Sequence, residues 1–312
     1  MTWPDRPVTV RVPATSANLG PGFDAMGLAL TLYDVVEARI TEAGLVIEVS
    51  GAGEDAATAG EGHLVVRAMR AAFGELGSQP PGIGLRCVNA IPQGFGLGSS
   101  AGAIVAGLTA ARALWPCDEA AAARALGDQA LLRLATALEG HPDNAAACLV
   151  GGLTIAWTED SRPRLARLEP LLALTPVLCV PGVPVLTAHA RLALPRTVPH
   201  ADAAANSARA ALLVAALTTD PALLLDATED FLHQRYRASA MPATAELVAT
   251  LRTAGIPAVV SGAGPAVLAL TVAGSTPGPG AVTAAAAGTG VPWQVLPLTV
   301  DRSGAGIQGS GG

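Results

Sequence analysis

Residues 92–102, PQGFGLGSSAG, hold four glycines and two serines but no charged side chain. Glycines ahead of a helix let the backbone curl around an anion, and the free N–H groups and positive dipole end of the helix bind it. Ser99 or Ser100 can cap such a helix while its hydroxyl bonds a phosphate or ligates Mg²⁺. The same pattern also fits a glycine turn with serine caps ahead of a buried, alanine-rich helix.

The basic residues narrow the choice of phosphate site. All 19 of them are arginine, because the sequence contains no lysine. This excludes the lysine of a P-loop or protein kinase and a lysine Schiff base. A phosphate site in this chain must therefore be built from backbone amides, a metal ion or arginine.

Two further stretches are too polar for a core. Residues 12–30, VPATSANLGPGFDAMGLAL, and residues 139–144, EGHPDN, contribute six polar candidates, namely Asn18, Asp24, Glu139, His141, Asp143 and Asn144. Taken singly, the histidine fits a structural loop residue, and the carboxylates fit solvated or capping groups. Arg191 and Arg237 would singly be surface charges. Only their convergence on one site would favour a functional reading.

Size and charge point to a small-molecule partner. A chain of 312 residues can form one large domain or two domains that share a cleft. A net charge of −6 with scattered basic residues argues against nucleic acid or an anionic membrane. The N-terminus has no signal-peptide pattern, which predicts a cytoplasmic protein. Uncharged runs at 87–111, 170–188 and 254–274 contain proline and predict core elements rather than membrane spans.

The four cysteines, Cys87, Cys117, Cys148 and Cys179, are far apart in the sequence and form no CxxC pair. Each follows or precedes apolar residues, so we expect reduced core thiols. Neither a disulfide framework nor a zinc site is predicted.

The elements that must position these residues follow from hydrophobic periodicity. Alternation predicts strands at 7–13 and 82–89, and apolar spacing predicts helices at 62–76, 100–114, 118–138, 201–217, 220–231, 243–254 and 280–287. The glycine loop thus lies between a strand and a helix. Alternating strands and helices predict an α+β fold with helices on a sheet. The charged, proline-bearing stretch 158–170 predicts a boundary between domains 1–160 and 161–300, and the glycine-rich tail 301–312 is predicted to be disordered.

Four segments in order and spacing resemble the homoserine kinase branch of the GHMP small-molecule kinases: PATSANLGPGFDAMGLAL, IPQGFGLGSSAGAIVAG, EGHPDNAAACLVGGL and SGAGPAVLAL. The match spans residues 8–270. The resemblance implies an N-terminal domain like ribosomal protein S5 domain 2, a ferredoxin-like C-terminal domain and ATP between them. The implied reaction is Mg²⁺-dependent phosphorylation of the side-chain hydroxyl of L-homoserine in threonine biosynthesis, and a homodimer is a family expectation.

The resemblance also implies roles for residues. Those expected to wrap the phosphates are Pro92, Gly94, Gly96, Leu97, Gly98, Ser99, Ser100, Ala101 and Gly102. Ser100 and Glu139 are expected to hold the metal. Asn18, Asp24, His141, Arg191, Arg237 and Gly264 are expected around the substrate. Asn144 is expected to align the reacting groups, with Asp143 as a second candidate that could act as base.

The sequence departs from the family at Gly102, where alanine is commoner; glycine costs up to about 1 kcal/mol against alanine in a helix interior. Two alternatives keep the fold: a kinase for another small alcohol, or a non-catalytic ligand sensor. A zwitterionic substrate needs both Arg191 and Asp24, whereas a neutral sugar needs neither.

Overall fold

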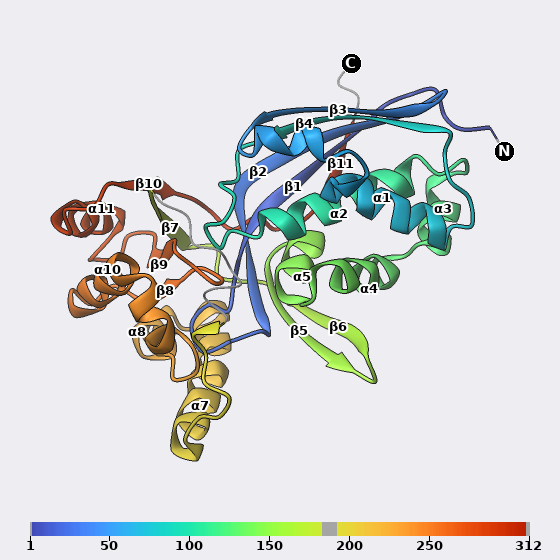
Figure 1. Cartoon of the computed structure of the whole chain (residues 1–312). Coiled ribbons are helices and arrows are strands. Elements are labelled where there is room, and N and C mark those ends of the chain that lie inside the picture. Colours follow the sequence, from blue (N-terminus) through green and yellow to red (C-terminus); the bar gives the residue numbers. More distant parts are fainter. Residues whose placement is uncertain (1, 183–191, 310–312) are drawn as a thin grey trace.

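The structure is a computed structural model that describes residues 2–182 and 192–309. Two sheets organise it (Figure 1). The larger sheet has the order β11-β1-β2-β4-β3, with β5 paired to β2 and β6 paired to β5. The smaller sheet has the order β10-β7-β9-β8, with antiparallel pairing throughout. This mixed architecture confirms the predicted α+β fold.

The larger sheet and its helices come mainly from the first half of the chain. Its elements in chain order are β1 (Val8–Ala17), β2 (Met26–Thr41), β3 (Gly44–Gly51), the 3₁₀ segment η1 (Glu54–Gly62), α1 (Leu64–Glu75), β4 (Gly82–Asn89), α2 (Ser99–Ala113), α3 (Glu119–Ala125), α4 (Asp128–Glu139), α5 (Asp143–Val150), β5 (Leu153–Glu159) and β6 (Arg162–Leu168). Helices α1, α2, α4 and α5 lie on one side of this sheet (Figure 1). They bury the apolar faces of β1, β2 and β4 in one core.

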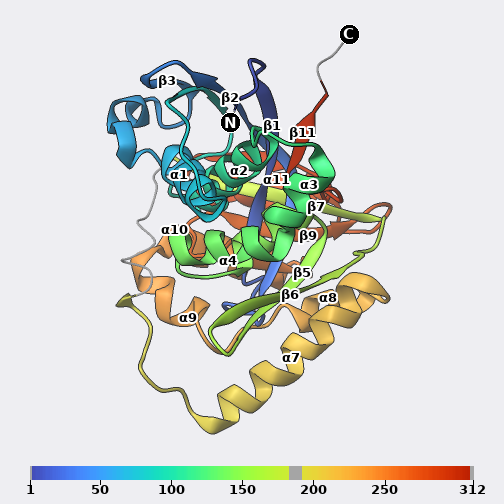
Figure 2. The same ribbon diagram turned by 90° about the vertical axis from the view of Figure 1, so that its right-hand side faces the viewer.

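The smaller sheet and its helices come from the second half. These elements are β7 (Leu174–Pro181), α7 (His200–Thr218), η2 (Pro221–Leu223), α8 (Leu224–Ala227), α9 (Gln234–Arg237), η3 (Ala238–Ala240), α10 (Pro242–Thr253), β8 (Ala258–Val260), β9 (Val267–Val272), α11 (Pro279–Gly288) and β10 (Trp293–Pro297). Helices α10 and α11 pack with this sheet in one core. Helix α7 runs along the lower edge of the molecule in the view of Figure 2.

A close helix contact explains why α2 is rich in small residues. At Gly107, an added Cβ would lie 2.4 Å from the backbone oxygen of Val65 in α1. Only glycine allows the two backbones to approach this closely. This contact lays α2 against α1 and fixes the direction in which its first turn points.

The predicted domain boundary is wrong by several residues. Position 160/161 falls in the tight turn of the β5–β6 hairpin, where Glu159 pairs with Arg162. The register continues to Leu153 opposite Leu168, so residues 162–168 belong to the larger sheet. The charged composition of this stretch reflects an exposed hairpin rather than a linker between domains.

The predicted disorder of the tail is also wrong for residues 301–309. Strand β11 (Gly306–Gln308) pairs with β1, with Ile307 opposite Val10. The buried carboxylate of Asp301 accepts hydrogen bonds from the N–H of Gly304 at 2.6 Å and from the hydroxyl of Tyr33 at 2.9 Å. Glycine and serine here form a turn around one buried acceptor, which composition alone does not reveal.

Three of the cysteines, Cys87, Cys148 and Cys179, are buried and free, as expected, whereas Cys117 is exposed and does not belong to the core. Burial raises the pKa of the Cys87 thiol to about 11, so this thiol stays protonated at neutral pH. Across the described ranges, no helix is both long and apolar enough to span a bilayer.

Candidate active site

The glycine loop connects β4 to α2, as predicted. Gly94, Gly96 and Gly98 have φ angles of 80°, 76° and 67°, a left-handed conformation that glycine adopts without strain. Gly98 is the N-cap of α2, and no side chain caps this helix. The expectation that Ser99 or Ser100 caps the helix is therefore wrong, because both serines already belong to its first turn. The first N–H groups of α2 are left for an anion.

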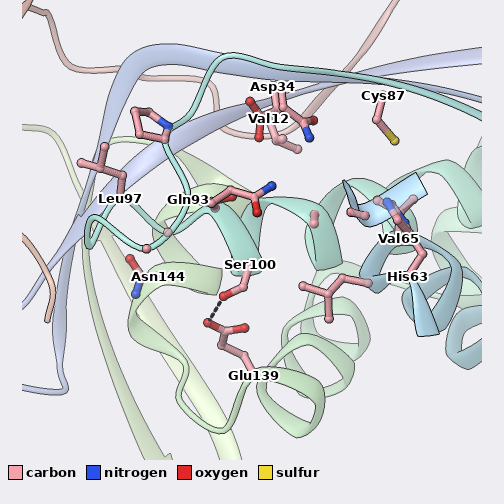
Figure 3. Close-up of a pocket in the computed structure, with 18 of the residues that line it drawn as sticks. Val12, Asp34, His63, Val65, Cys87, Gln93, Leu97, Ser100, Glu139 and Asn144 are labelled. Atoms are coloured by element: carbon pink, nitrogen blue, oxygen red, sulfur yellow. Dashed lines mark hydrogen bonds between the residues drawn. The ribbon is translucent and has the colours of Figure 1, made fainter. Parts of the chain in front are cut away.

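A serine and a glutamate meet beside this loop. The hydroxyl of Ser100 donates to Oε1 of Glu139 at 2.5 Å, which joins the first turn of α2 to the last residue of α4 (Figure 3). Gly140, with φ 96°, ends α4 and turns the chain towards His141. The geometry thus brings together the two residues predicted to hold a metal.

The two candidate catalytic residues, Asp143 and Asn144, are the first two residues of α5, and their side chains have different surroundings. Asp143 is 3% exposed, and its Oδ1 accepts the N–H of Asn144 at 2.8 Å. Asn144 lines a cavity beside the glycine loop, and its Oδ1 accepts a hydrogen bond from Thr15 Oγ1 at 2.8 Å. Of the pair, the amide is the group that a ligand in the cavity would meet.

The loop between β1 and β2 is folded around one side chain. Asn18 and Asp24 have φ angles of 70° and 53°, and asparagine and aspartate tolerate this region better than most residues. Oδ1 of Asn18 accepts the N–H of Asp24 at 2.9 Å, while its Nδ2 donates to the carbonyl of Gly262 at 2.8 Å. Asn18 therefore links this loop to the second half of the chain.

Arg237 is buried rather than a surface charge. It is 2% exposed, and its Nη1 lies 3.0 Å from Nδ1 of His233 and 3.4 Å from the carbonyl of Gly262. Nε2 of His233 lies 2.9 Å from the carbonyl of Gly20, and its ring stacks on Phe23 at 5.0 Å. Burial lowers the pKa of His233, so the ring is neutral: Nε2–H donates to Gly20 and Nδ1 accepts from the guanidinium.

The SGAGP turn closes over the glycine loop. Ser261 Oγ donates to the carbonyl of Gly96 at 2.8 Å, and Ala266 N–H donates to the carbonyl of Phe95 at 3.2 Å. A Cβ on Gly96 would lie 2.9 Å from the nitrogen of Gly264. This turn is thus in direct contact with the glycine loop.

One cavity of about 400 Å³ joins most of these residues. The predicted residues that line it are Pro92, Gly94, Gly96, Leu97, Gly98, Ser99, Ser100, Glu139, His141 and Asn144. Ala101 and Gly102 are buried behind it in α2. The predicted residues that do not line the cavity are Asn18, Asp24, Asp143, Arg237 and Gly264. Asn18 and Arg237 nevertheless contact Gly262, which does line it. Arg191 lies outside the described residues.

The cavity extends to residues that the sequence analysis missed. Ser100, Glu139 and Asn144 lie at one end, and His63 with Val65 lies at the other (Figure 3). His63 is 7% exposed, its Nδ1 has no hydrogen-bond partner, and burial lowers its pKa. Asp34 is buried in the same wall, and its Oδ1 accepts the N–H groups of Ala90 and Ile91 at 2.7 and 2.8 Å. Asp34 stands alone in an apolar stretch and His63 follows a glycine-containing loop, and no local motif marks either residue.

The charge of the cavity wall decides how an anion could bind. Neither lysine nor arginine is among its described lining residues, whereas Asp34 and Glu139 are. Within residues 2–182 and 192–309, no three or more His, Cys, Asp or Glu side chains gather as a metal site. Among the described lining residues, the backbone N–H groups of the glycine loop are therefore the groups that could bind a phosphate here.

Known proteins of one kinase family match nearly the whole chain. Residues 63–152 match the family model "GHMP kinases N terminal domain", and residues 209–286 match "GHMP kinases C terminal". The homoserine kinase of Streptomyces coelicolor is 55% identical over 96% of this chain and 94% of its own, and that of Clavibacter michiganensis is 49% identical over 97% and 94%. The crystal structure of homoserine kinase from Cytophaga hutchinsonii aligns with a TM-score of 0.83 at 26% identity, covering 99% of both chains.

Proposed function

This chain belongs to the homoserine kinases of the GHMP kinase family, and we propose how its residues divide the transfer of the γ-phosphoryl group from ATP to homoserine. The protein is an ATP-dependent phosphotransferase that phosphorylates homoserine, a step of threonine biosynthesis. The observation that carries the assignment of residues is that one cavity of about 400 Å³ joins the glycine loop to Ser100, Glu139 and Asn144.

We propose that residues 92–102 wrap the triphosphate. The three left-handed glycines turn the loop around the cavity, and the uncapped first turn of α2 supplies N–H groups and a positive dipole end. We place the nucleoside at the opposite end, where His63 and Val65 form a largely apolar wall. ATP would then lie along the length of the cavity.

We propose that Ser100 and Glu139 hold Mg²⁺ together with the phosphates. Mg²⁺ takes oxygen ligands at about 2.0–2.1 Å in octahedral geometry, so two adjacent ligands stand about 2.9 Å apart. The serine and glutamate oxygens are 2.5 Å apart, so a shift of about 0.4 Å would admit the ion. When bound, the metal neutralises part of the phosphate charge, which suits a wall that has no lysine or arginine among its described residues.

We propose that homoserine binds beside Gly262, where the two halves of the chain meet. Asp24 suits the α-ammonium group, and arginine grips an α-carboxylate through two parallel hydrogen bonds. Arg237 is held in a fixed position by His233 and Gly262, so little side-chain entropy is lost when it binds. We assign Asn18, His141, Gly264 and Arg191 to the same substrate site on the family resemblance.

We propose that Asn144 aligns the attacking hydroxyl and the γ-phosphoryl group. Phosphoryl transfer has a loose transition state, so its catalysis depends mainly on positioning the reacting groups and neutralising the phosphate charge. Asn144 lines the cavity, whereas the Asp143 carboxylate is buried and accepts the N–H of the next residue. We place Asp143 second as a general base, because its carboxylate is buried, does not line the cavity and already accepts the N–H of Asn144 through Oδ1.

The experiment is turnover by the purified protein with ATP and Mg²⁺. L-Homoserine should release ADP and form O-phospho-L-homoserine, and it should be the best acceptor in a panel that includes mevalonate, shikimate and a neutral sugar. A better acceptor from the panel would reassign the substrate within the same fold. ATP binding without transfer to any acceptor would instead support a ligand sensor.

We also propose a cytoplasmic homodimer, on family resemblance alone. Sedimentation velocity of the purified protein tests the dimer: a single species at twice the chain mass of 31.1 kDa is expected, and a monomer would refute it.

A further inference from the structure

Asn144 is held by a residue from a distant element, Thr15 of β1. Thr15 is fully buried, and its Oγ1 donates to Oδ1 of Asn144 at 2.8 Å across 129 positions of sequence. The backbone N–H of Thr15 also donates to the carbonyl of Leu97 in the glycine loop at 3.0 Å. A single residue therefore contacts both the loop and the candidate catalytic amide.

The fit between these residues is tight. At Gly98, an added Cβ would lie 2.0 Å from Oγ1 of Thr15 and 3.0 Å from Oδ1 of Asn144. The loop backbone therefore packs directly on the threonine–asparagine hydrogen bond. No space remains there for a water molecule to take over the role of the hydroxyl.

This hydrogen bond decides which end of the amide can reach a ligand. An asparagine side chain accepts through its oxygen and donates through its NH₂ group. Since Oδ1 accepts from Thr15, Nδ2 is the end that remains for the cavity. If the amide flipped, the Thr15 proton would lose its acceptor in a buried site, and Oδ1 would face anionic phosphate oxygens.

We propose that Thr15 is a positioning residue that fixes Asn144 as a hydrogen-bond donor to the transferring phosphoryl group, an inference that rests on the proposed function. The acceptor hydroxyl oxygen bonds to the γ-phosphorus while the bond to the β,γ-bridging oxygen breaks, and that electron pair stays on ADP. Because the Asn144 amide is held as a donor, the hydroxyl proton passes to an oxygen of the transferred phosphoryl group. Thr15 acts only through the orientation of Asn144.

The test is a double-mutant cycle with T15V, which keeps the shape of threonine and removes the hydroxyl. We expect kcat to fall by about 10–100-fold, with the KM values for ATP and homoserine changed less than about threefold, because the lost interaction is made in the transition state. T15S retains the hydroxyl and should recover most of kcat. In the N144A background, T15V should cause no further loss, since the two residues act as one unit.

Three results would overturn the inference: an unchanged kcat in T15V, a T15S variant as slow as T15V, or a T15V effect of equal size in the N144A background. If T15V does not fold, judged by its thermal midpoint, the comparison of T15S with T15C replaces it. The thiol is a weak donor of similar size, so we expect T15C to be slower than T15S; equal rates would count against the role.

The wild-type protein separates this inference from the proposed function. If homoserine is not an acceptor, the proposed function fails, and the slow transfer from ATP to water still reports on Asn144. In that assay T15V and N144A should lower the rate by the same factor, and the double variant should lower it no further. Independent, additive losses would refute the positioning role.

Discussion

Alanine at position 102 should stabilise the protein, although the residue lies next to the glycine loop. Gly102 is inside α2, its φ is not in the left-handed region, and an added Cβ would find Val12 Cγ2 at 3.7 Å as its nearest neighbour outside the helix backbone. This is an ordinary van der Waals distance. Alanine gains about 1 kcal/mol over glycine in a helix interior, and burying a methyl group adds up to about 0.8 kcal/mol.

We therefore expect G102A to raise the free energy of unfolding by about 0.5–1.5 kcal/mol, or the thermal midpoint by about 1–4 °C. Urea denaturation and differential scanning calorimetry measure these quantities. The matched control is G107A, on the same helix, where the added Cβ would lie 2.4 Å from the carbonyl oxygen of Val65. Overpacking against backbone costs about 3 kcal/mol, which exceeds the gain in propensity.

The signs of the two changes should therefore be opposite, with G107A destabilising by about 1–2 kcal/mol. If both variants shift stability in the same direction, the close contact between α1 and α2 does not govern the choice of glycine. If G102A destabilises the protein, the space beside Val12 is not available to a methyl group, and the expected gain in stability is refuted.

Three further expectations concern the metal pair, a buried histidine and the C-terminal segment. S100A should lower kcat by about 10–100-fold and raise the Mg²⁺ concentration needed for half-maximal rate, because the chain has no lysine to neutralise the phosphate charge in place of the metal. An unchanged rate at limiting Mg²⁺ would refute the proposed role of Ser100 as a metal ligand. Burial lowers the pKa of His233, so the folded state binds fewer protons than the unfolded state below about pH 6.5. The stabilising contribution of the neutral His233 ring is therefore complete above about pH 6.5 and is lost as the pH falls below that value. The free energy of unfolding should fall by at most about 1.36 kcal/mol per pH unit. Urea titrations from pH 7.5 to 5.5 should show this slope, and H233Q should flatten it; equal slopes would contradict it. D301A should lower the free energy of unfolding by about 3–5 kcal/mol, because it leaves buried donors without an acceptor. D301N should lower it by only about 1 kcal/mol, because the amide carbonyl still accepts. Equal losses would show that the hydrogen bonds to the Asp301 carboxylate do not fix this segment.

Periodicity predicted the long helices well, because each buries one continuous face. Helices expected at 62–76, 201–217 and 243–254 are found at Leu64–Glu75, His200–Thr218 and Pro242–Thr253. The helix expected at 118–138 is instead two helices, interrupted at Leu126 and Gly127, where Gly127 is the N-cap of α4. A single glycine inside an alanine-rich pattern is too weak a signal to place such a break.

The helix predicted at 220–231 is wrong for a different reason. Only η2 and α8 form there, and the Asp230 carboxylate caps the next segment by accepting N–H groups of Leu232, His233 and Gln234. Aspartate competes for backbone donors in this way wherever the chain can turn. Composition shows the aspartate but not whether a turn is available to it.

The candidate site was predictable to the extent that it consists of local motifs. The glycine loop, the Ser100–Glu139 pair and Asn144 come from stretches of unusual local composition, and they meet in one cavity. Thr15, His63 and Asp34 are placed by contacts between distant segments. His63 and Asp34 stand outside the motifs, and the composition of residues 12–30 does not show that Thr15 contacts Asn144. Such residues become visible only when the fold brings the segments together.

The bond from Ser261 to Gly96 spans 165 positions of sequence. During synthesis, the glycine loop leaves the ribosome long before the turn that covers it has been translated. A nascent chain ending near residue 170 would possess every backbone amide of the loop but lack the Ser261 hydroxyl and the Ala266 N–H, which donate to the loop carbonyls of Gly96 and Phe95. If the loop binds the triphosphate as proposed, the ability to bind nucleotide would therefore arise late in translation, after the second half has emerged, however early the first half folds.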